Sequence, residues 1–329
     1  NDVNLSNANM SSHTPAGQMM TFASEITKDY TYKYLLPKKY AEAHQLGDIH
    51  IHDLDYYPTK TTTCIQYDLD DLFERGFHTK NGSIRTPQSI QSYATLATII
   101  FQTNQNEQHG GQAIPAFDFF MAKGVLKSYQ KAVTSILSFY LEVKGETTVK
   151  EESLSEAIHQ YLTSIEPNSE MKKGLVKALQ ASAITINAEE LEHILHKTYA
   201  QTRKETHQAM EGFIHNLNTM HSRGGNQVVF SSINYGTDTS AEGRMVIEEL
   251  LKATVEGLGQ RGEVPVFPIQ IFKIKDGVSY SEADYQLAIQ DFDAALEGKI
   301  QFEAPNFDLF LKACRTTAKA LFPNFMFLD

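Results

Sequence analysis

NQVVFSSI, at residues 226–233, is a β-rich stretch, and a helical pattern follows it over residues 241–258. VPVFPIQIFKI, at residues 264–274, repeats this arrangement, with a second helical pattern over residues 281–296. Parallel strands need a long, usually helical, connection between them, so this alternation favours an α/β fold with a parallel sheet. The sequence has neither an internal repeat nor a Pro/Ser-rich linker, and we therefore expect one domain.

The N-terminal region predicts short elements. Two helices are expected over residues 20–36 and 38–46, with Pro37 between them because proline cannot continue a helix. DIHIHD (48–53) alternates with period two and indicates a short strand or an extended loop. TTTCIQ (61–66) is β-branched and indicates another short strand.

The middle of the chain, over residues 87–140, is mainly helical in pattern. Its apolar residues at steps of three and four predict one buried stripe, made of Ile90, Tyr93, Ala97 and Ile100. The opposite face has Gln, Ser and Thr but no charge, so we expect it to pack against a second subunit or another part of the chain. Further on, a capping box of Asn187 with Glu190 predicts the start of a long helix that reaches Leu217.

The composition bounds the function. With 40 acidic and 29 basic residues the net charge is −11, so we expect no general binding to nucleic acid. Residues 1–20 lack the apolar core of a secretory signal, and the longest uncharged stretch, 86–106, is too polar to span a bilayer. We therefore expect no membrane association. Two cysteines cannot build a disulfide framework or a Cys-rich metal site, which favours a reducing, cytoplasmic setting.

His50 and His52 form the first candidate site. They are alternate residues of an extended segment, so their imidazoles point to the same side, and Asp48, Asp53 and Asp55 lie nearby in sequence. This cluster is compatible with a His-x-His metal site, as in metal-dependent hydrolases on an α/β barrel. It is also compatible with polar side chains that form hydrogen bonds beneath a loop. The spacing alone leaves both interpretations open.

The two cysteines differ in context. Cys64 lies in an uncharged, β-branched segment that an exposed thiol seldom has, so it is either a small buried hydrophobic residue or a reactive thiol. Cys314 belongs to an apolar helical stripe and is therefore predicted to be a packing residue. The other members of that stripe are Phe307, Phe310, Leu311, Ala318 and Leu321.

Three polar or glycine-rich segments could meet a ligand. NQNEQHGGQ (104–112) contains Gly110 and Gly111, and RGGNQ (223–227) precedes a strand. Glycines allow the backbone to approach phosphate oxygens, but both segments are equally typical of loops. SSINYG (231–236) closes a strand with small polar groups, as ligand-facing strand ends in α/β proteins do.

Taken in order, these segments resemble the anaerobic, glycyl-radical (class III) ribonucleoside-triphosphate reductases. The resemblance extends over nearly the whole chain and includes the specific sequence GDIHIHDLDYY, followed shortly by a Thr-Cys strand. The matching stretches are NANMSSHTPAGQM (7–19), LLPKKYAEAHQLGDIHIHDLDYYPTKTTTCIQ (35–66), GSIRTPQSIQSYATLATIIFQTNQNEQHGGQ (82–112), VVFSSINYGT (228–237), EVPVFPIQIFKIKDGV (263–278) and LFPNFMFLD (321–329).

The resemblance implies the fold and the reaction. The fold is a ten-stranded α/β barrel made of two antiparallel five-stranded halves, in a homodimer. The reaction is the reduction of ribonucleoside triphosphates at the 2′ carbon by glycyl and thiyl radical chemistry, with formate or a thiol as reductant. A radical S-adenosylmethionine activating protein with an iron–sulfur cluster installs the glycyl radical. A structural zinc is expected, and ATP, dATP and deoxynucleoside triphosphates are the expected effectors.

The resemblance also implies roles for individual residues. Cys64 matches the early-strand cysteine that takes part in reducing the 2′ position, which makes it the expected catalytic residue. His52 and Asp53 match the HDLD segment beside the substrate, where His52 would bind ribose or phosphate rather than a metal. The other implied substrate-binding positions are Ser231, Ser232, Asn234, Gly110 and Gly111.

Parts of the family pattern are not found in these 329 residues. The cysteine that forms the thiyl radical follows the segment matched by LFPNFMFLD, whereas Cys314 precedes that segment and is not matched. The zinc-binding cysteines, the glycyl-radical motif and the N-terminal ATP-cone are also absent. We therefore expect residues 1–329 to be most of one barrel domain, incomplete at the C-terminus. The alternatives are a metal-dependent hydrolase that uses the His-x-His site and a non-catalytic fragment for nucleotide binding and dimerisation.

Overall fold

The fold is built on a parallel sheet. The computed structural model describes residues 11–79, 82–145, 151–182, 184–221 and 227–328. Within these residues five strands form the sheet in the order β1-β4-β5-β6-β7, and every neighbouring pair is parallel. The predicted α/β fold with a parallel sheet is confirmed. The strands are β1 (Ile65–Gln66), β4 (Gln112–Ile114), β5 (Ser231–Tyr235), β6 (Ile269–Ile274) and β7 (Asn324–Phe327). A separate antiparallel hairpin consists of β2 (Phe77–Thr79) and β3 (Gly82–Ile84).

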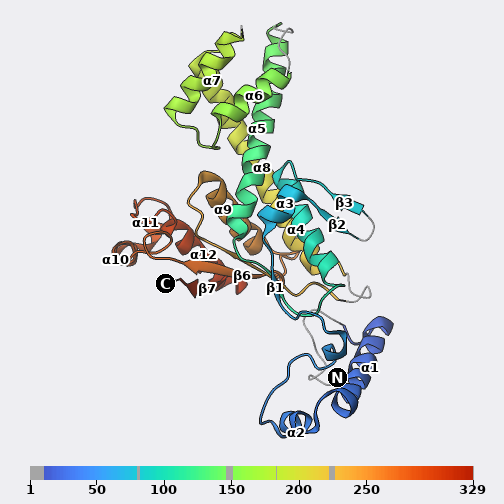
Figure 1. The fold of residues 1–329 in the computed structure, drawn as a ribbon. Helices are drawn as coiled ribbons and strands as arrows, with labels where there is room; N and C mark the ends of the chain where they lie inside the picture. The colour runs from blue at the N-terminus through green and yellow to red at the C-terminus, as the bar shows by residue number, and fades with distance from the viewer. Residues whose placement is uncertain (1–10, 80–81, 146–150, 183, 222–226, 329) are drawn as a thin grey trace.

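Long helices cover one face of the sheet (Figure 1). α5 (Phe117–Val143) packs on β5, and α12 (Phe307–Ala320) packs on β6. Around α5 pack α4 (Ile90–Asn104), α8 (Ala188–Thr219) and α9 (Ala241–Glu256). The main hydrophobic core therefore lies between the sheet and these helices.

Shorter helices complete this body. α6 (Glu151–Tyr161) and α7 (Ser169–Ala181) pack against α5 and α8 at the top of Figure 1. α3 (Leu69–Arg75) follows β1, whereas α10 (Glu282–Gln290) and α11 (Phe292–Leu296) lie between β6 and α12 in sequence. The predicted order of strands and helices after residue 226 is confirmed.

The N-terminal elements lie at the opposite end of the molecule from α6 and α7 (Figure 1). They are α1 (Pro15–Tyr30), the π-helical turn η2 (Thr31–Leu35), α2 (Lys38–Leu46) and the 3-10 turn η3 (Tyr57–Thr59). Both predicted helices are confirmed. The first starts earlier than expected because the Thr14 hydroxyl caps it, accepting a hydrogen bond from the Gly17 amide at 3.1 Å.

One face of α1 is apolar and exposed. The side chains on it recur at helical spacing and are Met19, Phe22, Ile26 and Tyr30. Apolar surface of this extent normally meets another part of a protein.

Two predictions about helices are confirmed. Asn187 and Glu190 form the capping box that opens α8: the Glu190 amide donates to Asn187 Oδ1 at 2.8 Å, and the Asn187 amide donates to Glu190 Oε2 at 3.0 Å. The predicted stripe of α4 is buried in the core, consisting of Ile90, Tyr93, Ala97 and Ile100.

The structure narrows or corrects some local predictions. Of the two possibilities for residues 48–53, the structure shows a loop and no strand, because they enter a turn in which Asp53 adopts a left-handed conformation with φ of 52°. In TTTCIQ only Ile65 and Gln66 are paired in a strand. The strand β4, between β1 and β5, was not predicted, since its three residues directly follow a polar run and are too few to show a period of their own.

The predicted apolar stripe of α12 is only half correct. Phe307 and Leu311 are buried, but Ala318 and Leu321 are exposed, and Cys314 is half-buried. The C-terminal turn of α12 buries Thr316 and Ala320 instead, so the helix presents a different side at that end.

The two faces of the sheet differ. Alternate residues of β5 are fully buried under the helices, and the same holds for β6. The residues between them lie on the other face, which no helix in the described part of the chain covers in Figure 1 and which we call the helix-free face. One register row of this face contains Gln66, Ala113, Ser232 and Ile269, and the next contains Asn234, Ile271 and Asn324.

Of the helices in the described part of the chain, none has the length and apolar character that crossing a bilayer requires.

Candidate active site

Cys64 lies directly before β1, at the edge of the sheet. It is exposed, so the expectation of a buried thiol is wrong for this structure. The reason is that, within the described residues, β1 is an edge strand of two residues that pairs with β4 alone. Gln66, two residues after Cys64, lies on the helix-free face.

Gly110 and Gly111 pack against this edge. Gly110 has φ of 106°, and a Cβ atom there would lie 1.4 Å from the carbonyl oxygen of Thr63, so only glycine fits. The Ile65 amide donates to the carbonyl oxygen of Gly111 at 3.1 Å. The structure therefore brings the two predicted glycines next to Cys64, through the residues on either side of it.

Asp53 lies between two imidazoles. Its Oδ2 is 2.6 Å from Nδ1 of His52, and its Oδ1 is 3.1 Å from Nε2 of His109. The His52 side chain is 77% exposed, but those of His109 and Asp53 are only 21% and 15% exposed. The His109 ring also stacks on Tyr56, with centroids 3.7 Å apart and planes at 14°. The predicted pair of His52 and Asp53 therefore has a third member, His109, which contacts Asp53 and which the sequence analysis did not identify.

A cavity of about 500 Å³ opens beside this cluster. It contains imidazole, carboxylate, ammonium and hydroxyl groups, which together suit a polar, anionic ligand. Lys60, whose left-handed backbone has φ of 54°, was not identified from the sequence either. The lining residues are Leu35, His52, Asp53, Tyr56, Tyr57, Pro58, Lys60, Thr61 and Thr63.

The predicted residues of β5 divide between the two faces. Ser232 and Asn234 lie on the helix-free face, whereas Ser231 is fully buried on the other and donates to the Val229 carbonyl at 3.3 Å. Oδ1 of Asn234 is buried, and no hydrogen-bond partner for it occurs among the described residues. Only Ser232 and Asn234 can therefore face a ligand from this strand.

The end of β5 is held by a buried carboxylate. Asp118 Oδ2 accepts hydrogen bonds from the amides of Gly236, Thr237 and Asp238 at 2.8–3.0 Å. Burial raises the pKa of Asp118, although these backbone donors favour its ionised form. This arrangement fixes the turn that follows Asn234.

The His-x-His metal interpretation gains no support. The rings of His50 and His52 lie 5.9 Å apart and edge to face. In the described part of the chain, no three His, Cys, Asp or Glu side chains are arranged to hold a metal ion. Most of the glycine-rich segment 223–227 lies outside the described residues.

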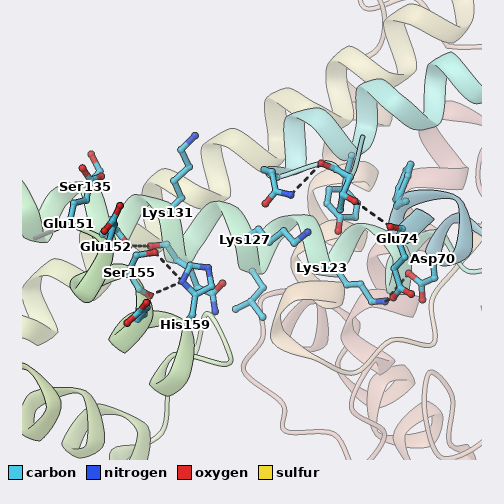
Figure 2. A pocket seen from close by; sticks show the side chains of 18 residues that line it. Asp70, Glu74, Lys123, Lys127, Lys131, Ser135, Glu151, Glu152, Ser155 and His159 are labelled. Carbon is cyan, nitrogen blue, oxygen red and sulfur yellow. Dashed lines mark hydrogen bonds and ion pairs between the residues drawn. The ribbon is translucent and has the colours of Figure 1, made fainter. Parts of the chain in front are cut away.

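A larger cavity, of about 1060 Å³, lies along α5 (Figure 2). Lys123, Lys127 and Lys131 follow one another at steps of four on that helix. Figure 2 shows Lys123 directed toward Asp70, to which it forms an ion pair at 2.9 Å, while carboxylates of α6 such as Glu151 gather at the other end.

Lys127 is the most restricted of these lysines. Burial, and then the charge of Lys123, lower its pKa, and its Nζ donates to the Pro87 carbonyl at 3.0 Å. A bound anion would relieve this unfavourable environment of the ammonium group.

Fold and site together define a class: an α/β protein whose parallel sheet carries an exposed thiol and a cluster of polar groups at one edge. The family model of the anaerobic ribonucleoside-triphosphate reductase matches residues 6–329, and the chain belongs to this family.

Individual relatives agree with this assignment. The anaerobic ribonucleoside-triphosphate reductase of Escherichia coli strain K12 is 26% identical over 326 residues, covering 98% of this chain and 36% of that protein. The enzyme of the same name from Enterobacteria phage T4 is 23% identical, covering 98% of this chain and 42% of that protein. The chain thus spans about two fifths of the length of these relatives or less.

A solved structure shares the fold. The anaerobic ribonucleotide reductase from Thermotoga maritima, solved in complex with dATP and CTP, superposes with a TM-score of 0.52 at 12% identity. The match covers 96% of this chain and 43% of that one.

Proposed function

We propose that the chain is the part of an anaerobic ribonucleoside-triphosphate reductase that carries one of the reducing cysteines and part of the substrate site. The observation that carries this proposal is the position of Cys64, an exposed thiol at the sheet edge that directly follows Thr63, which lines the cavity beside Asp53 and His52. The substrates are ribonucleoside triphosphates, reduced at the 2′ carbon, with formate or a thiol as the external reductant.

The chain's own residues fit such a substrate. Lys60 and His52, at the cavity of about 500 Å³, provide an ammonium group and an imidazole that can bind phosphate or ribose hydroxyls. Asn234 has a buried oxygen that a ligand hydroxyl could satisfy, and Ser232 lies on the same face. Gly110 and Gly111 allow their segment to pack closely against the strand edge at Thr63 and Ile65.

We infer further that residues 1–329 form most of one barrel domain, with the five parallel strands as one half of a ten-stranded barrel. Support comes from the helix-free face of the sheet, from the apolar face of α1 that nothing described covers, and from the greater length of the relatives. An apolar surface of this kind gains stability when a second half-barrel packs against it.

The cavity along α5 is our candidate for the effector site. Lys127 and Lys131 provide cations for the phosphates of ATP, dATP or another deoxynucleoside triphosphate, whereas Lys123 is paired with Asp70. Lys131→Ala should weaken dATP binding at least tenfold in calorimetry. Lys173→Ala, at an exposed position on α7, is the matched control and should bind normally. Equal affinities would remove the effector assignment and leave the active-site proposal intact.

The remaining partners follow from the family. We propose a homodimer, activated by a radical S-adenosylmethionine protein with an iron–sulfur cluster, in the cytoplasm. A glycyl radical in the complete enzyme would supply the hydrogen-atom abstraction that starts the reaction. We propose that the structural zinc lies outside the described residues, in which no three ligand side chains are arranged to hold a metal ion. The family match over residues 6–329 disfavours a metal-dependent hydrolase.

The test is Cys64→Ala in the complete, activated enzyme. We expect no deoxynucleotide from CTP, with the glycyl-radical signal in electron paramagnetic resonance unchanged. Cys314→Ala is the matched control, because Cys314 lies on α12 away from this site, and it should retain activity. Normal turnover by Cys64→Ala would refute the proposal. Binding of CTP without reduction in the unaltered enzyme would instead favour a non-catalytic nucleotide-binding module.

A further inference from the structure

His109 makes two contacts with the turn that carries the HDLD segment. Its Nε2 lies 3.1 Å from Oδ1 of Asp53, and its ring stacks on Tyr56 at 3.7 Å between centroids. The His109 side chain is mostly buried. It is therefore held by both a polar and an aromatic interaction, which together define the ring's orientation.

The neighbours of His109 contact the strand edge at Cys64. The Thr62 hydroxyl donates to Oε1 of Gln108 at 3.4 Å. Gly110 lies against the Thr63 carbonyl, and the Gly111 carbonyl accepts from the Ile65 amide. Residues 108–111, which we call the bridging segment, thus contact both sides of Cys64 and, through His109, the Asp53 turn.

Of the two imidazoles at Asp53, His109 is the stronger anchor. His52 is largely exposed, and interactions of exposed side chains are weakened by water and by side-chain entropy. The His109 contact is screened less because both side chains are mostly buried. Asp53 also holds a left-handed backbone conformation, which persists only where neighbouring contacts favour it.

We propose that His109 is a positioning residue that sets the distance and orientation between the Cys64 thiol and the Asp53–His52 pair. It acts through the bridging segment and does not itself take part in bond making. The expected effect of His109 on the rate of CTP reduction rests on the function proposed above. Its expected effect on the local stability of residues 51–56 and 61–65 does not.

Three variants separate the two contacts of His109. His109→Phe keeps an aromatic ring on Tyr56 but has no N–H group for Asp53. His109→Gln keeps an N–H donor but has no ring, and His109→Ala loses both. His78→Ala is the matched control, because His78 bonds to Ser83 within the β2–β3 hairpin.

The first measurement is amide hydrogen exchange by mass spectrometry on the complete protein. In His109→Ala, peptides that cover residues 51–56 and 61–65 should exchange at least fivefold faster, while those of β5 and β6 stay unchanged. In His109→Phe, the amides of residues 51–56 should exchange faster than in the wild type. In His109→Gln, their exchange rate should lie between those of the wild type and His109→Ala. Wild-type exchange in His109→Ala would overturn the proposal, whatever the activity. If His109→Ala does not fold, the Phe and Gln variants provide the test, and wild-type exchange in both of them would overturn the proposal.

The second measurement is steady-state reduction of CTP by the activated enzyme. A positioning role predicts that kcat falls at least tenfold in His109→Ala, that KM changes less than threefold, and that glycyl-radical content stays normal. His109→Gln should recover part of the loss. An equal fall in folded fraction and activity, without a change in kcat per folded enzyme, would reduce His109 to a structural residue. Absence of CTP reduction in the unaltered enzyme would refute the proposed function, and the exchange result would still decide the role of His109.

Discussion

Gly110→Ala tests whether the bridging segment is packed against the strand edge at Cys64. A left-handed conformation costs an alanine about 1–2 kcal/mol. The new Cβ would lie 1.4 Å from the Thr63 carbonyl oxygen, and a carbon–oxygen contact needs about 3.3 Å, so the two backbones must separate by roughly 2 Å. That shift breaks the hydrogen bond from the Ile65 amide to Gly111, worth about 1 kcal/mol. We therefore expect the free energy of unfolding to fall by about 2–3 kcal/mol.

Gly47→Ala is the matched control for this substitution. Gly47 also has a positive φ, of 84°, but no atom lies within 4 Å of the position of its Cβ. Its replacement by alanine should lower the free energy of unfolding only by the cost of the left-handed backbone conformation, about 1–2 kcal/mol. Urea unfolding gives both losses, and exchange of the Ile65 amide detects a local detachment of β1. Equal losses, together with unchanged exchange at Ile65, would refute the packing argument.

Three other predictions concern separate regions. Iodoacetamide at pH 8 should alkylate the exposed Cys64 before Cys314, since burial raises the pKa of Cys314 to about 11; peptide mass spectrometry showing the reverse order would contradict this. Hydrogen bonding to Lys144 lowers the pKa of Glu190 to about 2, so its stabilisation is present above pH 4.5 and is lost as the pH falls toward 2. The midpoint of thermal unfolding should depend less on pH in Glu190→Gln than in the wild type over that range. The same pH dependence in both proteins would argue against the Lys144–Glu190 pair. Tyr93→Asp should unfold the protein, at a cost of about 3–5 kcal/mol, because it places a charge in the core; a cooperative wild-type-like transition by circular dichroism would contradict this.

The sequence predicted the elements whose pattern is local. The capping box at Asn187 was correct in both hydrogen bonds, since the participating groups lie three residues apart. The strand–helix alternation after residue 226 was correct because each element is long enough to show its own period. β4 was missed because its three residues directly follow a polar run and are too few to show a period, and their strand conformation depends on pairing with β5.

The errors at the site have a different origin. Cys64 lies in a β-branched segment, yet its exposure is decided by its place at the sheet edge, which depends on the order of strands distant in sequence. His109 was not singled out because its partner Asp53 is far from it along the chain. The HGG pattern drew attention to the flexible backbone of the glycines, while the histidine before them makes the side-chain contacts.

Two carboxylates organise the opposite ends of the candidate site, and their surroundings give them different roles. Asp118 is fully buried and accepts from three consecutive amides, so its removal leaves several buried donors unpaired, and the turn after Asn234 depends on it for folding. Asp53 is mostly buried, but two side chains meet it rather than consecutive backbone amides, and one of them, His52, is largely exposed. The β5 end of the site is therefore held in place by the hydrogen bonds of Asp118. The edge at Cys64 depends on the bridging segment, because a two-residue strand supplies too few ladder hydrogen bonds to hold it there alone.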